Sequence, residues 1–135
     1  MAKTFYPKGA EKMLRSSINF DSDTIKVAIL SSSYTYSTAH EFFSDVSAYV
    51  VGTPQTLTNK STTGGVFDAD DPDFGAIAAG STMACIVFYK DTGTAGTSPL
   101  LEYNTEVTGF PAATHGGGVT IPWNNGAGRI FSLVG

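Results

Sequence analysis

The feature that most constrains the fold is the apolar run from Met83 to Tyr89, in which neighbouring positions are all apolar. Successive side chains of a strand point to opposite faces of the sheet, so a strand without polar alternation needs cover on both faces. We therefore expect this run at the centre of a layered β core. Cys85 lies within it, where a free cysteine behaves as a small buried hydrophobe, and a single cysteine excludes an internal disulfide.

A long polar loop without charge follows the run. After Asp91 the chain reads TGTAGTS, and Pro99 precedes the next apolar segment. Such residues are typical of turns, and loops on a rigid scaffold often carry binding residues. The loop offers hydrogen bonds without charge, which suits contact with another protein surface. Its candidate interaction residues are Thr92, Thr94 and Thr97.

Composition favours one β-rich domain spanning residues 1–135. A chain of this length matches the commonest domain size, and we find no linker that would divide it. Only 15% of the residues are charged, whereas 15 are glycines, as expected of a β protein with many turns. The net charge of −4 is opposite in sign to that of most nucleic-acid-binding modules, so we expect no nucleic-acid partner.

Residues 1–17 are expected to form an arm and a helix. Pro7 suits the first turn of a helix, and Ala10, Met13 and Leu14 recur at helical spacing, which predicts a helix over residues 7–17. The preceding arm, residues 1–6, carries Phe5 and Tyr6 as candidate contact residues. It has no partner within its own segment, so it docks either on its own core or on a neighbouring subunit. Four cations, Lys3, Lys8, Lys12 and Arg15, gather here; a solvated helix face is a simpler interpretation than a phosphate or acidic-protein site.

The remainder, residues 24–135, is predicted to be an antiparallel β-sandwich or small barrel with one further short helix. Residues 24–31 form the first strand, and later apolar segments follow at intervals typical of such folds. Thr38 precedes Glu41 by three residues, as in a capping box, which predicts the short helix near residues 39–46. Just before it, Tyr34 and Tyr36 are expected to form an exposed aromatic patch. The sequence Asn124-Asn125-Gly126 suits a tight hairpin turn between Trp123 and Arg129, and Pro122 places its strand at an edge or a bulge.

Residues that could carry chemistry are few. Asp68, Asp70, Asp71 and Asp73 offer carboxylates at calcium-like spacing, but the Gly and Glu of an EF-hand loop are missing and Asp71-Pro72 is ordinary turn chemistry. His40 and His115 are the only histidines. The His115-Gly-Gly-Gly segment is similar to an esterase oxyanion loop, yet no G-x-S-x-G motif accompanies it. The GTAG segment lacks the Lys-Ser or Lys-Thr of a P-loop. We predict no enzyme activity, no cofactor, no metal and no small-molecule substrate.

No segment of the chain reaches the length of a continuous apolar transmembrane helix, and the N-terminus lacks the apolar stretch of a signal peptide. We therefore expect no membrane partner, and synthesis in a cytoplasm as a protein that stays soluble.

Several segments of the chain resemble a group of small structural proteins of tailed bacteriophages. The most specific are YPKGAEKML at residues 6–14, GVFDADD at 65–71, YKDTGTAGTSPL at 89–100 and WNNGAGRIF at 123–131. Members of this group look like head decoration or cement proteins. The resemblance implies a non-enzymatic virion protein on the capsid surface, made in the host cytoplasm, that binds the major capsid protein and itself, often as a homotrimer.

Two other functions stay open at the sequence level. A tail-associated structural protein, at the tail tip, on the tail tube or at a fibre base, would share the same resemblance. A small sugar-binding or hydrolytic domain would use Trp123, the tyrosines and the aspartates. We favour this last function least, because a β core needs its aromatic residues for packing.

Overall fold

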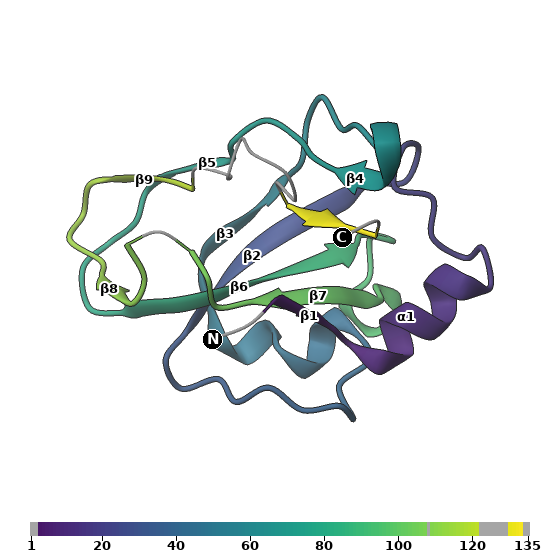
Figure 1. Ribbon diagram of the computed structural model, residues 1–135. Coiled ribbons are helices and arrows are strands. Elements are labelled where there is room, and N and C mark those ends of the chain that lie inside the picture. Colours follow the sequence, from purple (N-terminus) through teal and green to yellow (C-terminus); the bar gives the residue numbers. More distant parts are fainter. Residues whose placement is uncertain (1–2, 108, 122–129, 134–135) are drawn as a thin grey trace.

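An antiparallel sheet of six strands forms the centre of the computed structural model (Figure 1), which describes residues 3–107, 109–121 and 130–133. Five strands follow the order β1-β7-β6-β2-β3, and β8 pairs with one end of β6. Two small antiparallel pairs, β4 with β10 and β5 with β9, complete the β structure. The strands are β1 (Lys3–Phe5), β2 (Ile25–Ser31), β3 (Val50–Thr56), β4 (Val66–Phe67), β5 (Asp73–Ala76), β6 (Thr82–Lys90), β7 (Leu100–Asn104), β8 (Ala112–Ala113), β9 (Gly118–Thr120) and β10 (Phe131–Ser132).

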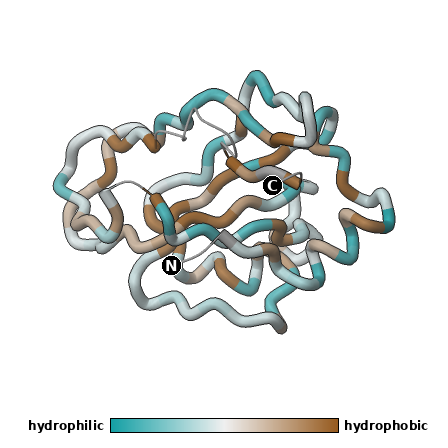
Figure 2. Tube along the Cα trace, in the orientation of Figure 1, coloured by the Kyte–Doolittle hydropathy of each residue, from teal (hydrophilic) through white to brown (hydrophobic). Residues whose placement is uncertain are grey.

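The apolar run from Met83 to Tyr89 lies in β6, between β2 and β7, as predicted. Ile86 of β6 lies opposite Ile29 of β2, and Val87 opposite Ala28. All four side chains are fully buried. The brown apolar stretches in the middle of Figure 2 follow these central strands.

Each face of the sheet has its own apolar core. One core takes Val27, Ile29 and Phe88 from the sheet and adds residues of the two small strand pairs, such as Phe67 and Phe131. The opposite core takes Ala28, Leu30, Cys85 and Val87 from the sheet and adds Tyr34 and Val46 from the segment between β2 and β3. Figure 1 shows the small strand pairs on one side of the sheet and that segment on the other. The expected cover on both faces is therefore present.

The prediction of a mainly β, antiparallel fold with a short N-terminal helix is confirmed. A sandwich or barrel is not confirmed, since no closed sheet occurs within the described residues. The central sheet is instead covered by two short strand pairs on one face and by an irregular segment on the other. The irregular cover has no backbone periodicity that the sequence could have revealed.

The N-terminal arm docks on its own chain. Its described residues form β1, which pairs antiparallel with β7 and brings Lys3 opposite Asn104. Tyr6 follows, with its N–H donating to the carbonyl of Leu101 at 2.9 Å and its side chain fully buried. Of the two docking alternatives, the structure shows the intramolecular one.

The helix α1 (Pro7–Leu14) ends three residues earlier than predicted. Ser16 adopts a left-handed conformation with φ of 64°, and the N–H of Ser17 donates to the carbonyl of Lys12 at 2.9 Å. A left-handed residue with such a back-bonded N–H is a common way to terminate a helix. Gly9 faces β7 so closely that an added Cβ would lie 2.0 Å from the carbonyl oxygen of Leu100.

The second predicted helix is replaced by two 3-10 turns, η1 (Phe43–Asp45) and η2 (Ser47–Tyr49). The expected capping box of Thr38 and Glu41 does not start them. The Asp45 carboxylate accepts the N–H groups of Glu41 at 2.8 Å and Phe42 at 3.0 Å, so Asp45 takes the place of Glu41 as the acid that caps the start of the turn. Two further 3-10 turns are η3 (Thr63–Gly65) and η4 (Ala95–Thr97).

The predictions for Pro122, Trp123, the 124–126 turn and Arg129 lie outside the described residues. No helix in the described part of the chain is both long and apolar enough to cross a membrane.

Replacing Gly9 with Ala tests the close approach of α1 to β7. Alanine raises helix propensity by about 1 kcal/mol, but forcing a methyl group into a packed contact costs about 1–3 kcal/mol. Because the Cβ would meet backbone that cannot turn away, we expect a net loss of stability in urea unfolding. Gly96→Ala is the matched control, since its added Cβ meets no atom within 4 Å. A Gly9→Ala protein as stable as Gly96→Ala would contradict this packing.

Candidate interaction surfaces

The polar loop after β6 is ordered by its own hydroxyl groups. Thr92 Oγ1 lies 2.6 Å from Thr97 Oγ1, and Ser98 Oγ donates to the carbonyl of Thr94 at 2.8 Å. The N–H of Thr92 donates to Ser98 Oγ at 3.0 Å. Thr92, Thr94 and Thr97 are nevertheless exposed. The three predicted interaction residues therefore lie together on one exposed, internally hydrogen-bonded loop.

Ion pairs and hydrogen bonds join the end of β6 and the base of the loop to β2 and to the segment that precedes β2. Asp91, at the base of the loop, pairs with Lys26 of β2 at 3.2 Å. Lys90 of β6 pairs with Asp23 at 3.2 Å and donates to the carbonyl of Ser17, while Lys60 donates to the carbonyl of Asp23. These contacts join residues far apart in sequence, and sequence patterns gave no signal for them.

The same contacts lower the pKa of both aspartates. The N–H of Gly93 holds the pKa of the Asp91 carboxyl below its ordinary value, and Lys26 lowers it further against the effect of burial. Burial alone would raise the pKa of Asp23, but the N–H of Asn19 and the ammonium of Lys90 outweigh it, so that this pKa is also lowered. Both carboxylates are thus stabilised in their charged form by folding.

Tyr6 of the arm and Tyr34 of the predicted exposed patch both pack inside the chain. Their exposed fractions are 0% and 7%, and their hydroxyl oxygens lie 2.7 Å apart. Tyr34 Oη also lies 2.8 Å from His40 Nδ1. Tyr36 is half-buried and donates to the carbonyl of Phe5 at 3.2 Å. These tyrosines connect the N-terminal arm to the segment between β2 and β3, so their first role is structural.

Burial keeps the reactive groups of this cluster neutral. Desolvation raises the pKa of Tyr34 to about 12 and that of the Cys85 thiol to about 12, and it raises the pKa of Tyr6 as well. A thiol is nucleophilic only as the thiolate, so Cys85 is chemically inert where it lies. Phe5, the remaining predicted contact residue, is half-buried and packs edge-on against Phe131, with ring centroids 5.0 Å apart.

Asp68, Asp70 and Asp73 take part in local turns and bridges. The backbone of Asp68 pairs with that of Ser61 in both directions, Asn59 donates to the Asp70 carboxylate, and Asp73 accepts the N–H of Gly75 at 2.9 Å. Within the described residues, no group of three or more His, Cys, Asp or Glu side chains is placed to hold a metal ion.

The two histidines belong to different parts of the fold. His40 lies in the segment between β2 and β3 beside Tyr34, whereas His115 lies between β8 and β9. His115 is exposed, and its Nδ1 accepts the N–H of Gly117 at 3.2 Å. The glycines thus form a local turn around this imidazole instead of directing N–H groups toward an open oxyanion site.

An apolar groove beside α1 is the surface that sequence patterns missed. This α1 groove has a volume of about 370 Å³ and is lined by Phe5, Ala10, Met13, Leu14, Ile18, Phe20 and Leu133. Leu14 is 88% exposed and Leu133 is 67% exposed. The helical spacing identified Ala10, Met13 and Leu14 as an apolar face, but it could not show that Leu14 projects beyond the core.

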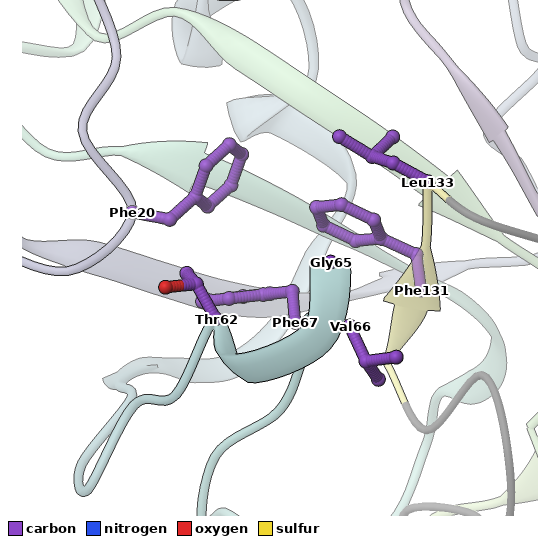
Figure 3. Close-up of a pocket in the computed structure, with 7 residues that line it drawn as sticks. All are labelled: Phe20, Thr62, Gly65, Val66, Phe67, Phe131 and Leu133. Carbon is purple, nitrogen blue, oxygen red and sulfur yellow. The ribbon is translucent and has the colours of Figure 1, made fainter.

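A smaller hollow of about 80 Å³ adjoins the α1 groove and shares Phe20 and Leu133 with it. Figure 3 shows the rings of Phe20, Phe67 and Phe131 turned toward one another in this hollow. Phe20 and Phe131 meet edge-on with centroids 5.4 Å apart. The apolar surface therefore continues from α1 to the β4–β10 pair.

Comparisons with models of protein families, with curated proteins and with solved structures found no match to this chain.

Replacing Asp91 with Asn tests the ion pair at the base of the loop. Folding lowers the pKa of this carboxyl, so the charged carboxylate stabilises the folded protein at pH values above the pKa of the unfolded chain, about 3.9. This stabilisation is lost as the pH falls through the lower pKa of the folded protein. We expect Asp91→Asn to lower the unfolding free energy at neutral pH by up to about 1 kcal/mol, as for a partly exposed pair. The difference from the wild type should shrink as the pH falls below about 4.

The measurement is urea unfolding at a series of pH values. Glu106→Gln, at an exposed position, is the control. A wild-type advantage over Asp91→Asn that stays constant through the acid range would show that the carboxylate charge is not responsible.

Replacing Tyr34 with Phe tests the hydroxyl chain between the arm and the irregular segment. The change removes two hydrogen bonds and leaves the Tyr6 hydroxyl without its buried partner, so we expect a loss of about 1–3 kcal/mol in unfolding free energy. Tyr49→Phe is the matched control, because Tyr49 lies in the same aromatic cluster and only its ring contacts Tyr34. Equal stability of the two variants would rule out a structural role for the hydroxyl chain.

Proposed function

We propose that this protein is a non-enzymatic structural component of a phage virion and, more specifically, a capsid decoration protein. It would bind the outer face of the head through contacts with the major capsid protein. The proposal starts from the resemblance in the four segments quoted above. It is supported by the way the fold presents one of them, the segment at residues 89–100.

The single observation that carries the proposal is the loop Asp91–Ser98. Its threonines are exposed, uncharged and held by hydrogen bonds within the loop and by the Asp91–Lys26 pair at its base. An ordered loop loses little conformational entropy when it binds a surface. Threonine hydroxyls also supply hydrogen bonds without the desolvation penalty of charged groups. This is the kind of surface that many copies could use to bind a repeated lattice, where linked contacts add avidity.

A tail-associated role is the second candidate, since the same resemblance is compatible with it. The same loop would then contact a tail protein or a host surface. The number and place of the copies distinguish the two roles. Labelling the protein in virions should show many copies spread over the head for a decoration protein, and a few copies at the tail for the alternative.

The place of the N-terminal arm changes how an interface should be tested. Deleting residues 1–6 would remove β1 and the fully buried Tyr6, and so would damage the sheet itself. Loss of binding by such a truncated protein would not identify a contact surface. Point changes at exposed loop positions leave the core intact.

Thr94→Lys in the loop is the test of the proposed contact. Thr94 is exposed, so a lysine should not disturb folding, but it would bring an unpaired charge into a neutral interface. We expect the affinity of added protein for heads that lack it to fall at least about tenfold, which corresponds to about 1.4 kcal/mol. Occupancy of the heads by co-sedimentation and electron microscopy is the measurement.

Thr53→Lys, at an exposed position of β3, is the control and should bind as the wild type does. If the Thr94→Lys protein occupies the heads as fully as the wild type does, the loop is not part of the interface. If the wild-type protein binds no heads and is found only at the tail, the decoration role is wrong and the tail role holds.

A further inference from the structure

The α1 groove combines a hollow and a projecting side chain on one surface. The hollow lies between α1, residues 18–20 and the end of the described chain at Leu133. Leu14, at the last position of α1, lines this groove and is 88% exposed. Leu14 and Leu133 are the two large apolar side chains that stay mostly exposed among the described residues, and both belong to the groove. Apolar surface gathered in this way marks a place where another surface is buried.

The α1 groove and the projecting Leu14 belong to the same surface, and this restricts the symmetry of a contact between two copies of the chain. When two copies join through two different patches, each copy keeps one patch free, and further copies add until a ring closes or a filament grows. When a single patch supplies both parts, a two-fold axis satisfies both copies at once. Leu14 of each copy then enters the groove of the other. In an antiparallel pair of α1 helices, Leu14 comes near Ala10 of the second copy, and that small side chain leaves room for it.

The charges beside the groove suit the same arrangement. Among the residues that the structure describes, no charged side chain lines the groove itself. On the adjoining flank of α1, Glu11 and Arg15 are both exposed, and their contact within the chain is loose at 3.8 Å. An antiparallel pair of helices brings Glu11 of one copy near Arg15 of the other, and the two-fold axis makes this pairing twice. Lys12 adds no like charge to the contact, because Glu41 binds it at 2.7 Å away from the groove.

We propose that the α1 groove is a two-fold dimer contact, in which Leu14 of each copy fills the groove of the other and Glu11 of each copy pairs with Arg15 of the other. This contact does not depend on the virion role, and it leaves the loop Asp91–Ser98 free for a different partner. It also differs from the homotrimer that the resemblance implies, since a two-fold contact closes at two copies.

The first test is the mass of the purified full-length protein by sedimentation and light scattering across a range of concentrations. The wild type should form a dimer. Leu14→Asp should raise the dissociation constant at least about a hundredfold, because it places a charge in the apolar contact. It should keep the folded circular dichroism spectrum of the wild type, since Leu14 is exposed in the single chain, but its melting temperature should lose the stabilisation that dimer formation gives the wild type. Thr53→Glu, at an exposed position of β3 that does not line the groove, is the control and should leave the dimer unchanged.

The second test exchanges the charges. Glu11→Arg and Arg15→Glu should each weaken the dimer about tenfold, because each puts like charges opposite one another twice. The double variant Glu11→Arg/Arg15→Glu should return the dissociation constant to within about threefold of the wild type. Recovery in the double variant supports the antiparallel pairing, and its failure overturns that pairing.

Three other results overturn the proposal. The first is a wild-type protein that stays monomeric at the highest concentration reached. If Leu14→Asp then abolishes binding to heads, the α1 groove binds a head protein instead of a second copy, and the dimer proposal is equally overturned. The second is a mass of three copies. The third is a dimer that Leu14→Asp leaves intact.

Discussion

The constraint that shapes the rest of the structure is that the apolar side chains on both faces of β6 and of its neighbour β2 must be buried. Neither strand has a polar face, so their pairing alone would leave apolar surface on two sides exposed to water. The chain meets this need asymmetrically. Two short strand pairs cover one face, and a largely irregular segment carrying Tyr34 and Val46 covers the other. Most of the remaining architecture, including the place of the N-terminal arm, serves to hold these two covers against the sheet.

The irregular cover is held by polar contacts as well as by packing. The hydroxyl of Tyr34 meets both Tyr6 and His40, Tyr36 reaches the backbone of β1, and Lys12 of α1 pairs with Glu41. Three of these contacts join the arm or helix that precedes β2 to the segment between β2 and β3, and the contact of Tyr34 with His40 lies within that segment. Short irregular segments lack a ladder of backbone hydrogen bonds, so side-chain contacts must fix their position. This explains why tyrosines that look like surface residues in the sequence are needed inside.

The sequence predicts the parts of this fold that depend on local patterns. The unbroken apolar run from Met83 to Tyr89, the start of the helix at Pro7 and the hydroxyl-rich loop after Asp91 were all recognisable, because each has a characteristic residue order. The docking of β1 on β7, the burial of Tyr6 and the pairing of Lys26 with Asp91 were not, since they join distant residues. The exposure of Leu14 was also missed, because helical spacing identifies an apolar face without showing what covers it. The threonines of the candidate site could thus be named, whereas the α1 groove could not.

The pairing of β1 with β7 has a consequence for how the chain folds during synthesis. Lys3 is synthesised well before its partner Asn104, and strands β2, β3 and β6 of the same sheet lie between them in the chain. Contacts between such distant residues require closure of a long loop and tend to form slowly. Until β7 is available, β1 has no strand to pair with, and the N–H of Tyr6 lacks the carbonyl of Leu101 that it bonds in the folded protein. The strand β1 is therefore synthesised before its neighbour β7, but it can join the sheet only after β7 has been made.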